Sequence, residues 1–404
     1  MRGTRWQDGS ARPVLLAALV VVPVLALAAF AVGRVASSEG GQPTSGDLLN
    51  PHPAAGPFAA DETTLEDCAA NDEPRRCLEQ AFGNVAYRTS GKRALALVAE
   101  RQQTDAEVDA GCHRIVHAVG AAVLAREEGD TGAALVDGDS TCWSGFYHGL
   151  LERALAPARS TAELGTLITT LCDPSEQNWP PFTHYQCLHG IGHGLMLRTG
   201  YALDASLDLC TRLSDDWSRQ SCDGGVFMES FSPSLTDEPP PFDANDPLAP
   251  CPTVSRNHKL YCYLQVADNL VRGTNYDWAR MASACRGERA ASWRAICFQG
   301  YGRQASGSNY GRPLEVARLC AIADGRAESE CVYGAARDIA SNAASGRPAA
   351  AFCGRLVNVL VGRCFEGVGT ILASLGTDST AIRNECATLA GAHRASCLRG
   401  AGLA

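Results

Sequence analysis

The sequence predicts an all-α protein in which a disulfide-stapled array of helical hairpins, an α-solenoid, follows one N-terminal transmembrane helix. Three observations lead to this fold class. Residues 13–33 form a long apolar run without charge. All 18 cysteines of the 404-residue chain lie between Cys68 and Cys397, an even and high count that is typical of proteins outside the reducing cytosol. A short motif around some of these cysteines recurs with a period of about 34 residues.

The apolar run is long enough to cross a membrane as a helix. Its 21 residues span roughly 30 Å at about 1.5 Å per residue, which matches the hydrocarbon core of a bilayer. Arg2, Arg5 and Arg12 precede the run, and the positive-inside rule therefore places this end in the cytoplasm. We predict a single-pass protein of the cell membrane with a cytoplasmic tail (1–12), a transmembrane anchor (13–33) and an extracytoplasmic remainder.

A cleaved signal peptide is the alternative interpretation of this segment, and it would give a secreted protein. Small residues at 26–28 and 29–31 resemble a cleavage site. These sites lie inside the apolar run, however, and the run is longer than the roughly 7–15 apolar residues of a signal core. An uncleaved anchor is therefore favoured. Residues 34–62 contain Ser, Gly, Pro and acidic residues without an apolar period, and we expect a flexible stalk there.

The recurring motif places a glycine three residues after a cysteine. Successive units lie 33–45 residues apart, and a period of this length with helical patterning is typical of a solenoid of helix pairs. Glycine inside a helix costs about 1 kcal/mol relative to alanine, so its recurrence in phase indicates close packing of neighbouring helices. The motif cysteines are Cys142, Cys187, Cys222, Cys297, Cys331, Cys364 and Cys397, and Cys262 keeps the frame with Gln265 in place of glycine.

A second series of cysteines precedes the first by 11–15 residues. We expect the first helix of each unit to end near one cysteine and the second helix to begin near the next, with one disulfide between them. Closing such a short loop stabilises the fold by about 3 kcal/mol in the chain-entropy model. The predicted pairs are Cys68–Cys77, Cys172–Cys187, Cys210–Cys222, Cys251–Cys262, Cys285–Cys297, Cys320–Cys331, Cys353–Cys364 and Cys386–Cys397, with Cys112–Cys142 as the ninth.

This pattern of two-helix units with one disulfide each resembles the Sel1-like, tetratricopeptide-type repeats of cysteine-rich secreted bacterial proteins. The resemblance is architectural and covers roughly residues 160–404. It implies an α-solenoid without an activity of its own, because such repeats usually bind proteins or peptides. We accordingly divide the folded part into an N-terminal helical region with histidine-bearing helices (63–160) and helical-hairpin repeats (161–404).

Possible metal ligands are concentrated in the first units. Three successive second helices each carry two of them at i, i+4 spacing, which places both side chains on one helix face. The following unit carries a glutamate in the corresponding segment. The pairs are His113 with His117, His148 with Glu152, and His189 with His193, and the glutamate is Glu229.

The repeat register predicts that these residues meet. His148 and His193 each lie six residues after their motif cysteine, and equivalent positions on stacked helices form a column. We expect at least three of the five imidazoles to converge on one transition metal ion (Zn, Fe, Mn or Cu). Glu152 or Glu229 should lie at the edge as a further ligand, an orienting group or a general base.

Two other interpretations of the histidines stay open. In the first, they catalyse a reaction without metal, with Glu152 or Glu229 orienting the ring. In the second, they are structural, and the protein is a non-catalytic scaffold that binds a protein or peptide on the solenoid face. Arg303 and Arg337 occupy the same column in later units, where they would meet an acidic partner. The formal net charge of −9 argues against nucleic acid as a partner.

Overall fold

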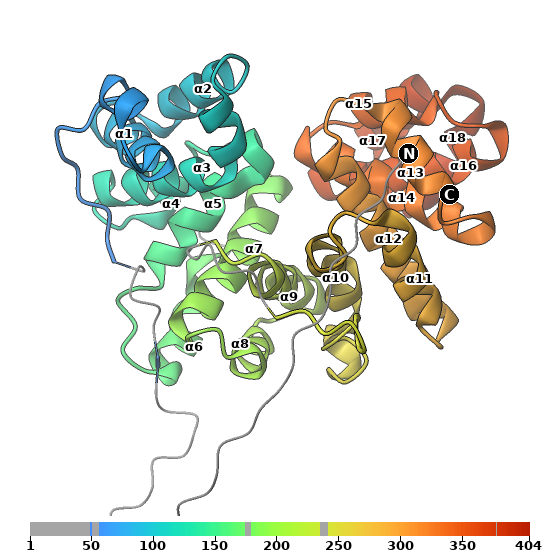
Figure 1. Ribbon diagram of the computed structural model, residues 1–404, viewed down its shortest axis with the longest axis horizontal. Coiled ribbons are helices and arrows are strands. Elements are labelled where there is room, and N and C mark those ends of the chain that lie inside the picture. Colours follow the sequence, from blue (N-terminus) through green and yellow to red (C-terminus); the bar gives the residue numbers. More distant parts are fainter. Residues whose placement is uncertain (1–48, 51–55, 174–178, 235–240, 377) are drawn as a thin grey trace, which may run out of the picture. The chain divides into compact units, whose positions relative to one another are not determined.

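The computed structural model describes residues 49–50, 56–173, 179–234, 241–376 and 378–404. These belong to one compact unit, Pro43–Ala404. Its described residues form eighteen α-helices, three short 3₁₀ helices and no strand (Figure 1), so the all-α prediction is confirmed. The tail (1–12) and the anchor (13–33) that the sequence predicts lie outside the described residues. Among the helices that are described, none is both long and apolar enough to span a membrane.

The helices of this unit form two layers. Inner helices pack side by side in chain order. They are α1 (Pro74–Arg88), α3 (Ala106–Arg126), α5 (Thr141–Ala154), α7 (Pro181–Arg198), α9 (Asp216–Phe231), α10 (Lys259–Gly273), α12 (Ala291–Ser308), α14 (Gly325–Asn342), α16 (Asn358–Leu375) and α18 (Arg394–Gly400). The outer helices are α2 (Gly91–Arg101), α4 (Thr131–Leu135), α6 (Thr161–Leu171), α8 (Leu203–Cys210), α11 (Trp278–Gly287), α13 (Pro313–Ala321), α15 (Gly346–Cys353) and α17 (Ser379–Ala390).

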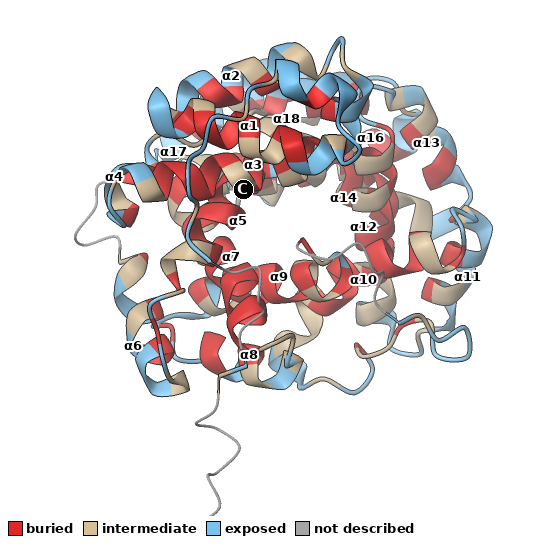
Figure 2. Ribbon diagram, turned by 60° about the vertical axis from the view of Figure 1, so that its left-hand side comes forward, coloured by how far each residue is buried: buried red, intermediate tan, exposed pale blue. Residues whose placement is uncertain are grey.

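The inner layer holds most of the core. Figure 2 shows buried residues along α5, α7, α9, α10 and α12, whereas α2, α11 and α17 expose one face. The series of inner helices curves back on itself, because α14 contacts α5 and α16 contacts α7. Most outer helices contact the two inner helices between which they lie in the chain, as α15 does with α14 and α16. The result is a helical repeat array, as the sequence predicts.

All nine predicted disulfides are present. The eight short-range pairs and the Cys112–Cys142 pair each have Cα–Cα separations of 5.4–5.8 Å, and the described residues contain no free cysteine. Most of them join the end of an outer helix to the following inner helix, as Cys210 of α8 does with Cys222 of α9. Nine disulfides indicate an oxidising compartment outside the cytoplasm for this domain.

Most motif cysteines do not mark the beginning of the second helices, which corrects one expectation, although Cys142 does so as the second residue of α5. Inner helices α7, α12 and α16 begin six residues earlier, at Pro181, Ala291 and Asn358. The cysteine therefore lies in the second turn of its helix. Because the two helices are antiparallel neighbours, this is the position that faces the last turn of the outer helix and its cysteine. The spacing between two paired cysteines therefore indicates where the two helices contact each other and not where they end.

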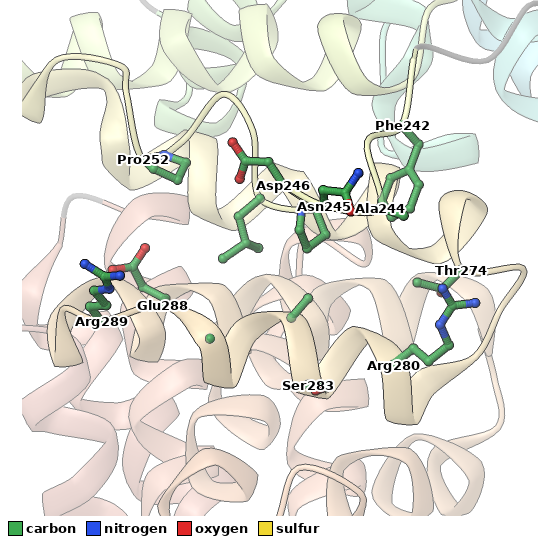
Figure 3. A pocket seen from close by; sticks show the side chains of 14 residues that line it. Phe242, Ala244, Asn245, Asp246, Pro252, Thr274, Arg280, Ser283, Glu288 and Arg289 are labelled. Carbon is green, nitrogen blue, oxygen red and sulfur yellow. The ribbon is translucent and has the colours of Figure 1, made fainter.

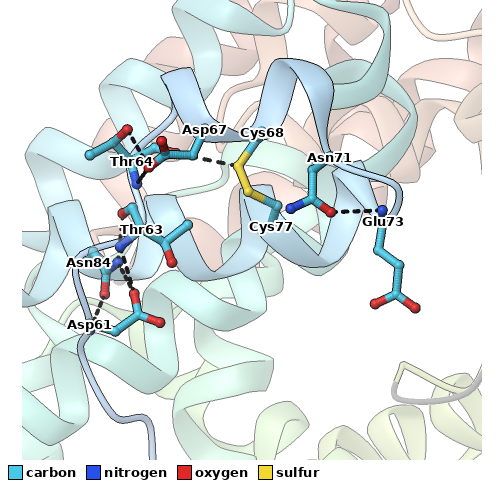
Figure 4. Close-up of a disulfide and its surroundings, with 9 residues drawn as sticks. All are labelled: Asp61, Thr63, Thr64, Asp67, Cys68, Asn71, Glu73, Cys77 and Asn84. Atoms are coloured by element: carbon cyan, nitrogen blue, oxygen red, sulfur yellow. Dashed lines mark hydrogen bonds between the residues drawn. A yellow bond between two sulfur atoms is a disulfide. The ribbon is translucent and has the colours of Figure 1, made fainter.

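The first unit is stapled and also packed from its N-terminal side. Cys68 of the short helix η1 (Glu66–Ala70) is bonded to Cys77 of α1 (Figure 4). The backbone N–H of Asp61 donates to Asn84 Oδ1 at 3.0 Å, and Asn84 Nδ2 donates to the Asp61 carboxylate at 2.8 Å. Phe58 packs against the core as well. Residues of the predicted stalk (34–62) next to residue 63 thus contact α1.

The recurring glycines allow neighbouring inner helices to touch backbone to backbone. A Cβ atom on Gly225 of α9 would overlap the carbonyl oxygen of His189 on α7. In the same way, a Cβ on Gly334 of α14 would overlap the carbonyl oxygen of Gln299 on α12. The predicted close approach is confirmed. It also explains how short side chains on one helix can meet those on the next.

Candidate metal centre

Four neighbouring inner helices bring all seven predicted residues together. Helices α3, α5, α7 and α9 pack in that order, each against the next. Their inward faces carry five imidazoles and two carboxylates, which we call the histidine cluster. Its members are His113 and His117 on α3, His148 and Glu152 on α5, His189 and His193 on α7, and Glu229 on α9.

The α3 pair is held by acceptors from α5. His113 Nδ1 lies 2.8 Å from the backbone carbonyl oxygen of Cys142, which can only accept a hydrogen bond. The neutral ring is therefore protonated at Nδ1, and Nε2 carries a lone pair. His117 Nδ1 lies 3.0 Å from Glu152 Oε1. The two Nε2 atoms of this pair are 3.1 Å apart and face each other.

In the α7 pair, His193 has a matching partner on α9. His193 Nδ1 lies 2.9 Å from Glu229 Oε2. The other oxygen of Glu229 accepts hydrogen bonds from the hydroxyl of Tyr201 at 2.8 Å and from the backbone N–H of Ser234 at 2.8 Å. This carboxylate is therefore fixed from three directions. His189 Nδ1 is buried and has no hydrogen-bond partner among the described residues.

His148 lies at the middle of the cluster. Its ring stacks on that of His193 with centroids 4.0 Å apart, which confirms that the repeat register places these two side by side. Its centroid is also 5.2 Å from each of the three other imidazoles. His148 Nδ1 is buried and has no hydrogen-bond partner among the described residues, and the same is true of His193 Nε2.

Burial keeps four of the five imidazoles neutral, those of His113, His148, His189 and His193. Only 1% of His148 and 1% of His193 is exposed. Removal from water, reinforced by repulsion between the rings, lowers the pKa of His113 and brings the pKa of His193 down to about 3. The same causes hold the pKa of His148 and His189 well below the ordinary value of 6.5. A neutral imidazole is the form that binds a metal ion, so the cluster is ready to act as a ligand set at neutral pH.

The two carboxylates behave differently. Burial by itself would raise the pKa of Glu152, but its neighbours His117 and Arg153 outweigh that effect and lower it. Burial and the negative charge of Glu152 raise the pKa of Glu229 to about 7. The Arg153 guanidinium lies 3.7 Å from Glu152 Oε2. A cation held by the imidazoles would favour the ionised form of Glu229 again.

Three sets of side chains in the cluster each offer ligand atoms that lie within 4.8 Å of one another. Two of them consist of imidazoles alone and share His148. The third combines both carboxylates with one imidazole. The sets are His113, His117 and His148; His148, His189 and His193; and Glu152, His193 and Glu229. Met228 lies six residues after its motif cysteine, as His148 does, and is half-buried. The next residue, Glu229, is the α9 residue that faces His193.

Sequence patterns missed the groups that surround the cluster. Tyr201 and Ser234 lie in connections, outside any repeat position, and no spacing identifies them as partners of Glu229. His258, which lies outside the repeat frame, also contacts α9: its Nδ1 lies 2.7 Å from Oδ2 of the buried Asp223. A motif cysteine followed by an acidic residue, as in Cys222-Asp223, is the one signal that could have drawn attention to this pair.

The Asp223–His258 pair gives a testable titration. Its hydrogen bond raises the pKa of His258 above 6.5, whereas burial acts in the opposite direction. We expect Asp223→Asn to lower the pKa of His258, because the largest effect that raises it is lost while the opposing effect of burial remains. Asp208→Asn, which removes a more distant charge, should lower it less. An NMR titration of the His258 ring measures both, and equal shifts in the two variants would contradict this pairing.

Arg303 pairs with acidic groups of this chain. Its Nη1 lies 3.0 Å from Asp268 Oδ2, and its Nε lies 4.0 Å from Asp338 Oδ1. The column position that His193 fills on α7 is thus filled by an ion pair between α10 and α12. An external acidic partner for Arg303 and Arg337 stays a prediction.

A separate surface cavity of about 780 Å³ lies between the segment 242–252 and helix α11. Figure 3 shows both acidic and basic side chains around it, among them Asp246, Glu288, Arg280 and Arg289. None of the seven cluster residues lines it. Among the described residues, the three groups of possible metal ligands all lie in the histidine cluster, and none of them lines this cavity.

Comparisons with known proteins found no protein-family model, curated protein or solved structure that matches this chain.

Proposed function

We propose that this protein binds a transition metal ion outside the cytoplasm through the imidazoles of α3, α5 and α7. The observation that carries the proposal is the orientation of the ring nitrogens. The outward nitrogen of His113 faces a carbonyl oxygen, and those of His117 and His193 face carboxylates. Acceptors on the outside require N–H groups there, which leaves lone pairs on the inside.

Lone pairs that face each other in a buried site repel unless a cation lies between them. His113 Nε2 and His117 Nε2 are 3.1 Å apart, close to the separation of two ligands on one ion with metal–nitrogen bonds of about 2.0–2.1 Å. If the neutral ring of His117 carried its proton on Nε2, this repulsion would be removed. Nδ1 would then carry the lone pair, which would face the carboxylate of Glu152. A metal ion satisfies both contacts at once.

The ligand chemistry narrows the choice of metal ion. The inward groups are imidazoles, which suit Zn, Cu and Fe, whereas Mn prefers carboxylate and water oxygens. Both glutamates face the outer nitrogens of histidines, where they orient the ring and increase its basicity. Among the four metals expected from the sequence, Zn, Cu and Fe fit this arrangement better than Mn.

We also propose that the apolar run 13–33 anchors this domain to the cell membrane. The run has the length of a membrane span, and the nine disulfides require that the domain lies on the oxidising side. Arginines before the run favour the same orientation.

The metal proposal is tested on the full-length oxidised protein by elemental analysis after dialysis against Zn²⁺, Cu²⁺ or Fe²⁺. We expect near-stoichiometric metal in the wild type and a lower metal content in His193→Ala, because an inward ligand is lost. Glu229→Gln should lower affinity about 10–100-fold through loss of orientation. His393→Ala is the matched control, since His393 lies in the short helix η3 (Gly391–His393), outside the cluster.

Circular dichroism of each variant checks that the helical fold persists. A wild type without metal, or a His193→Ala variant that retains it equally, would contradict the proposal. The histidines would then be structural, and the scaffold interpretation with a protein or peptide partner would replace it.

A further inference from the structure

The histidine cluster has an internal symmetry that a single ion does not explain. Helix α5 lies between α3 and α7, and its His148 stands between the two i, i+4 pairs of those helices. The two all-imidazole ligand sets overlap only at this residue. We call the set with the α3 pair the α3 position and the set with the α7 pair the α7 position.

The two positions have similar supporting groups. In the α3 position, one imidazole faces a carboxylate, Glu152, and the other faces the backbone carbonyl of Cys142. In the α7 position, the imidazole of His193 faces a second carboxylate, Glu229. Two imidazole sets, each with its own carboxylate, exceed what one ion needs.

The distances also separate the two positions. Ligands on one ion with bonds of about 2.0–2.1 Å lie at most about 4.2 Å apart. The ligand atoms of each set lie within 4.8 Å of one another, and closing a set on an ion takes inward movement together with rotation of the rings, since His148 and His193 are stacked. The rings of His117 and His193, one from each position, have centroids 6.3 Å apart and belong to different sets.

We propose that the cluster binds two transition metal ions, one in the α3 position and one in the α7 position, with the imidazole of His148 bridging them. The two ring nitrogens of His148 each bind one ion, and the ring proton is released to solvent. Of the four positive charges of two +2 ions, the bridging imidazolate and the carboxylates of Glu152 and Glu229 then neutralise three. This inference rests on the proposed metal-binding function.

The arrangement of Glu229 supports its role as an outer group of the α7 ion. Its Oε2 already contacts His193 Nδ1, and its Oε1 accepts from Tyr201 and Ser234. Ser234 Oγ also lies 3.2 Å from Glu152 Oε1 and 3.0 Å from Glu229 Oε1, so one hydroxyl links the two carboxylates. The two carboxylates of the third ligand set thus belong to a hydrogen-bonded network that connects the two positions.

The test is a titration of the metal-free, oxidised full-length protein with Zn²⁺ and, separately, with Cu²⁺. We expect two tightly bound ions per chain in the wild type and in the control His393→Ala. His117→Ala should lose the α3 ion and His193→Ala the α7 ion, so that each binds one. In the Cu²⁺ form, coupling through the bridge should reduce the electron paramagnetic resonance intensity of the wild type well below that of two isolated ions.

Each single-site variant should instead show the full intensity of one isolated Cu²⁺. A wild type that binds one ion, lost in His193→Ala, would overturn the two-ion inference and leave the proposed function intact. Binding of two ions with full, uncoupled intensity would overturn the shared His148. A wild type that binds none would overturn both proposals.

Discussion

Gly225→Ala is expected to destabilise the domain by about 3 kcal/mol or more, and to weaken metal binding with it. A Cβ at this position would overlap the carbonyl oxygen of His189 on α7, and backbone cannot move aside as a flexible side chain can. Helices α7 and α9 would have to separate. Because His193 on α7 is held by Glu229 on α9 at 2.9 Å, their separation also loosens the α7 ligands.

Gly307→Ala provides the matched control. Gly307 lies in the last turn of α12, and nothing lies within 4 Å of a Cβ placed there. The higher helix propensity of alanine should leave stability unchanged or raise it by up to about 1 kcal/mol. Chemical denaturation followed by circular dichroism measures both variants. Equal stabilities would show that the glycines reflect composition and not helix contact.

Reduction of the nine disulfides is expected to unfold the helical domain in the absence of denaturant. In the chain-entropy model, closing a loop of about 11 residues contributes roughly 3 kcal/mol. Nine such closures exceed the roughly 5–15 kcal/mol by which an ordinary domain is stable. Each two-helix unit buries little surface of its own, so the inner layer has no large reserve of packing energy to replace them.

Removal of one staple gives the graded form of this prediction. Cys210→Ser together with Cys222→Ser should cost about 3 kcal/mol and leave a folded domain, because the other eight bonds remain. Thermal unfolding of the oxidised protein, the double variant and the protein treated with reductant separates the three cases. A reduced protein that keeps its cooperative melting transition and its near-ultraviolet circular dichroism would contradict the dependence on disulfides.

Local spacing explains why much of this protein was predictable. The cysteine pairs are mostly 9–15 residues apart, so each bond closes within one helical hairpin and its partner follows from order along the chain. The i, i+4 histidines share a helix face for the same reason. Repeat register then places His148 beside His193, and their rings stack at 4.0 Å.

Other features depend on contacts that no spacing encodes. The inner helices begin before their motif cysteines, because their first turns are set by packing and not by the staple. Arg303 finds acidic partners on α10 and α14, which lie next to its own helix. His258 reaches Asp223 from a connection that has no place in the repeat.

The sequence by itself determined the helical hairpins, their nine disulfides and the faces on which seven possible ligands lie, because each follows from residues close together in the chain. Only the tertiary structure decided which carboxylate supports which imidazole, how Tyr201 and Ser234 fix Glu229, and that His148 separates two ligand sets. Those features depend on the lateral placement of four helices to within a few tenths of an ångström. That placement comes from glycine contacts and packing across the whole inner layer.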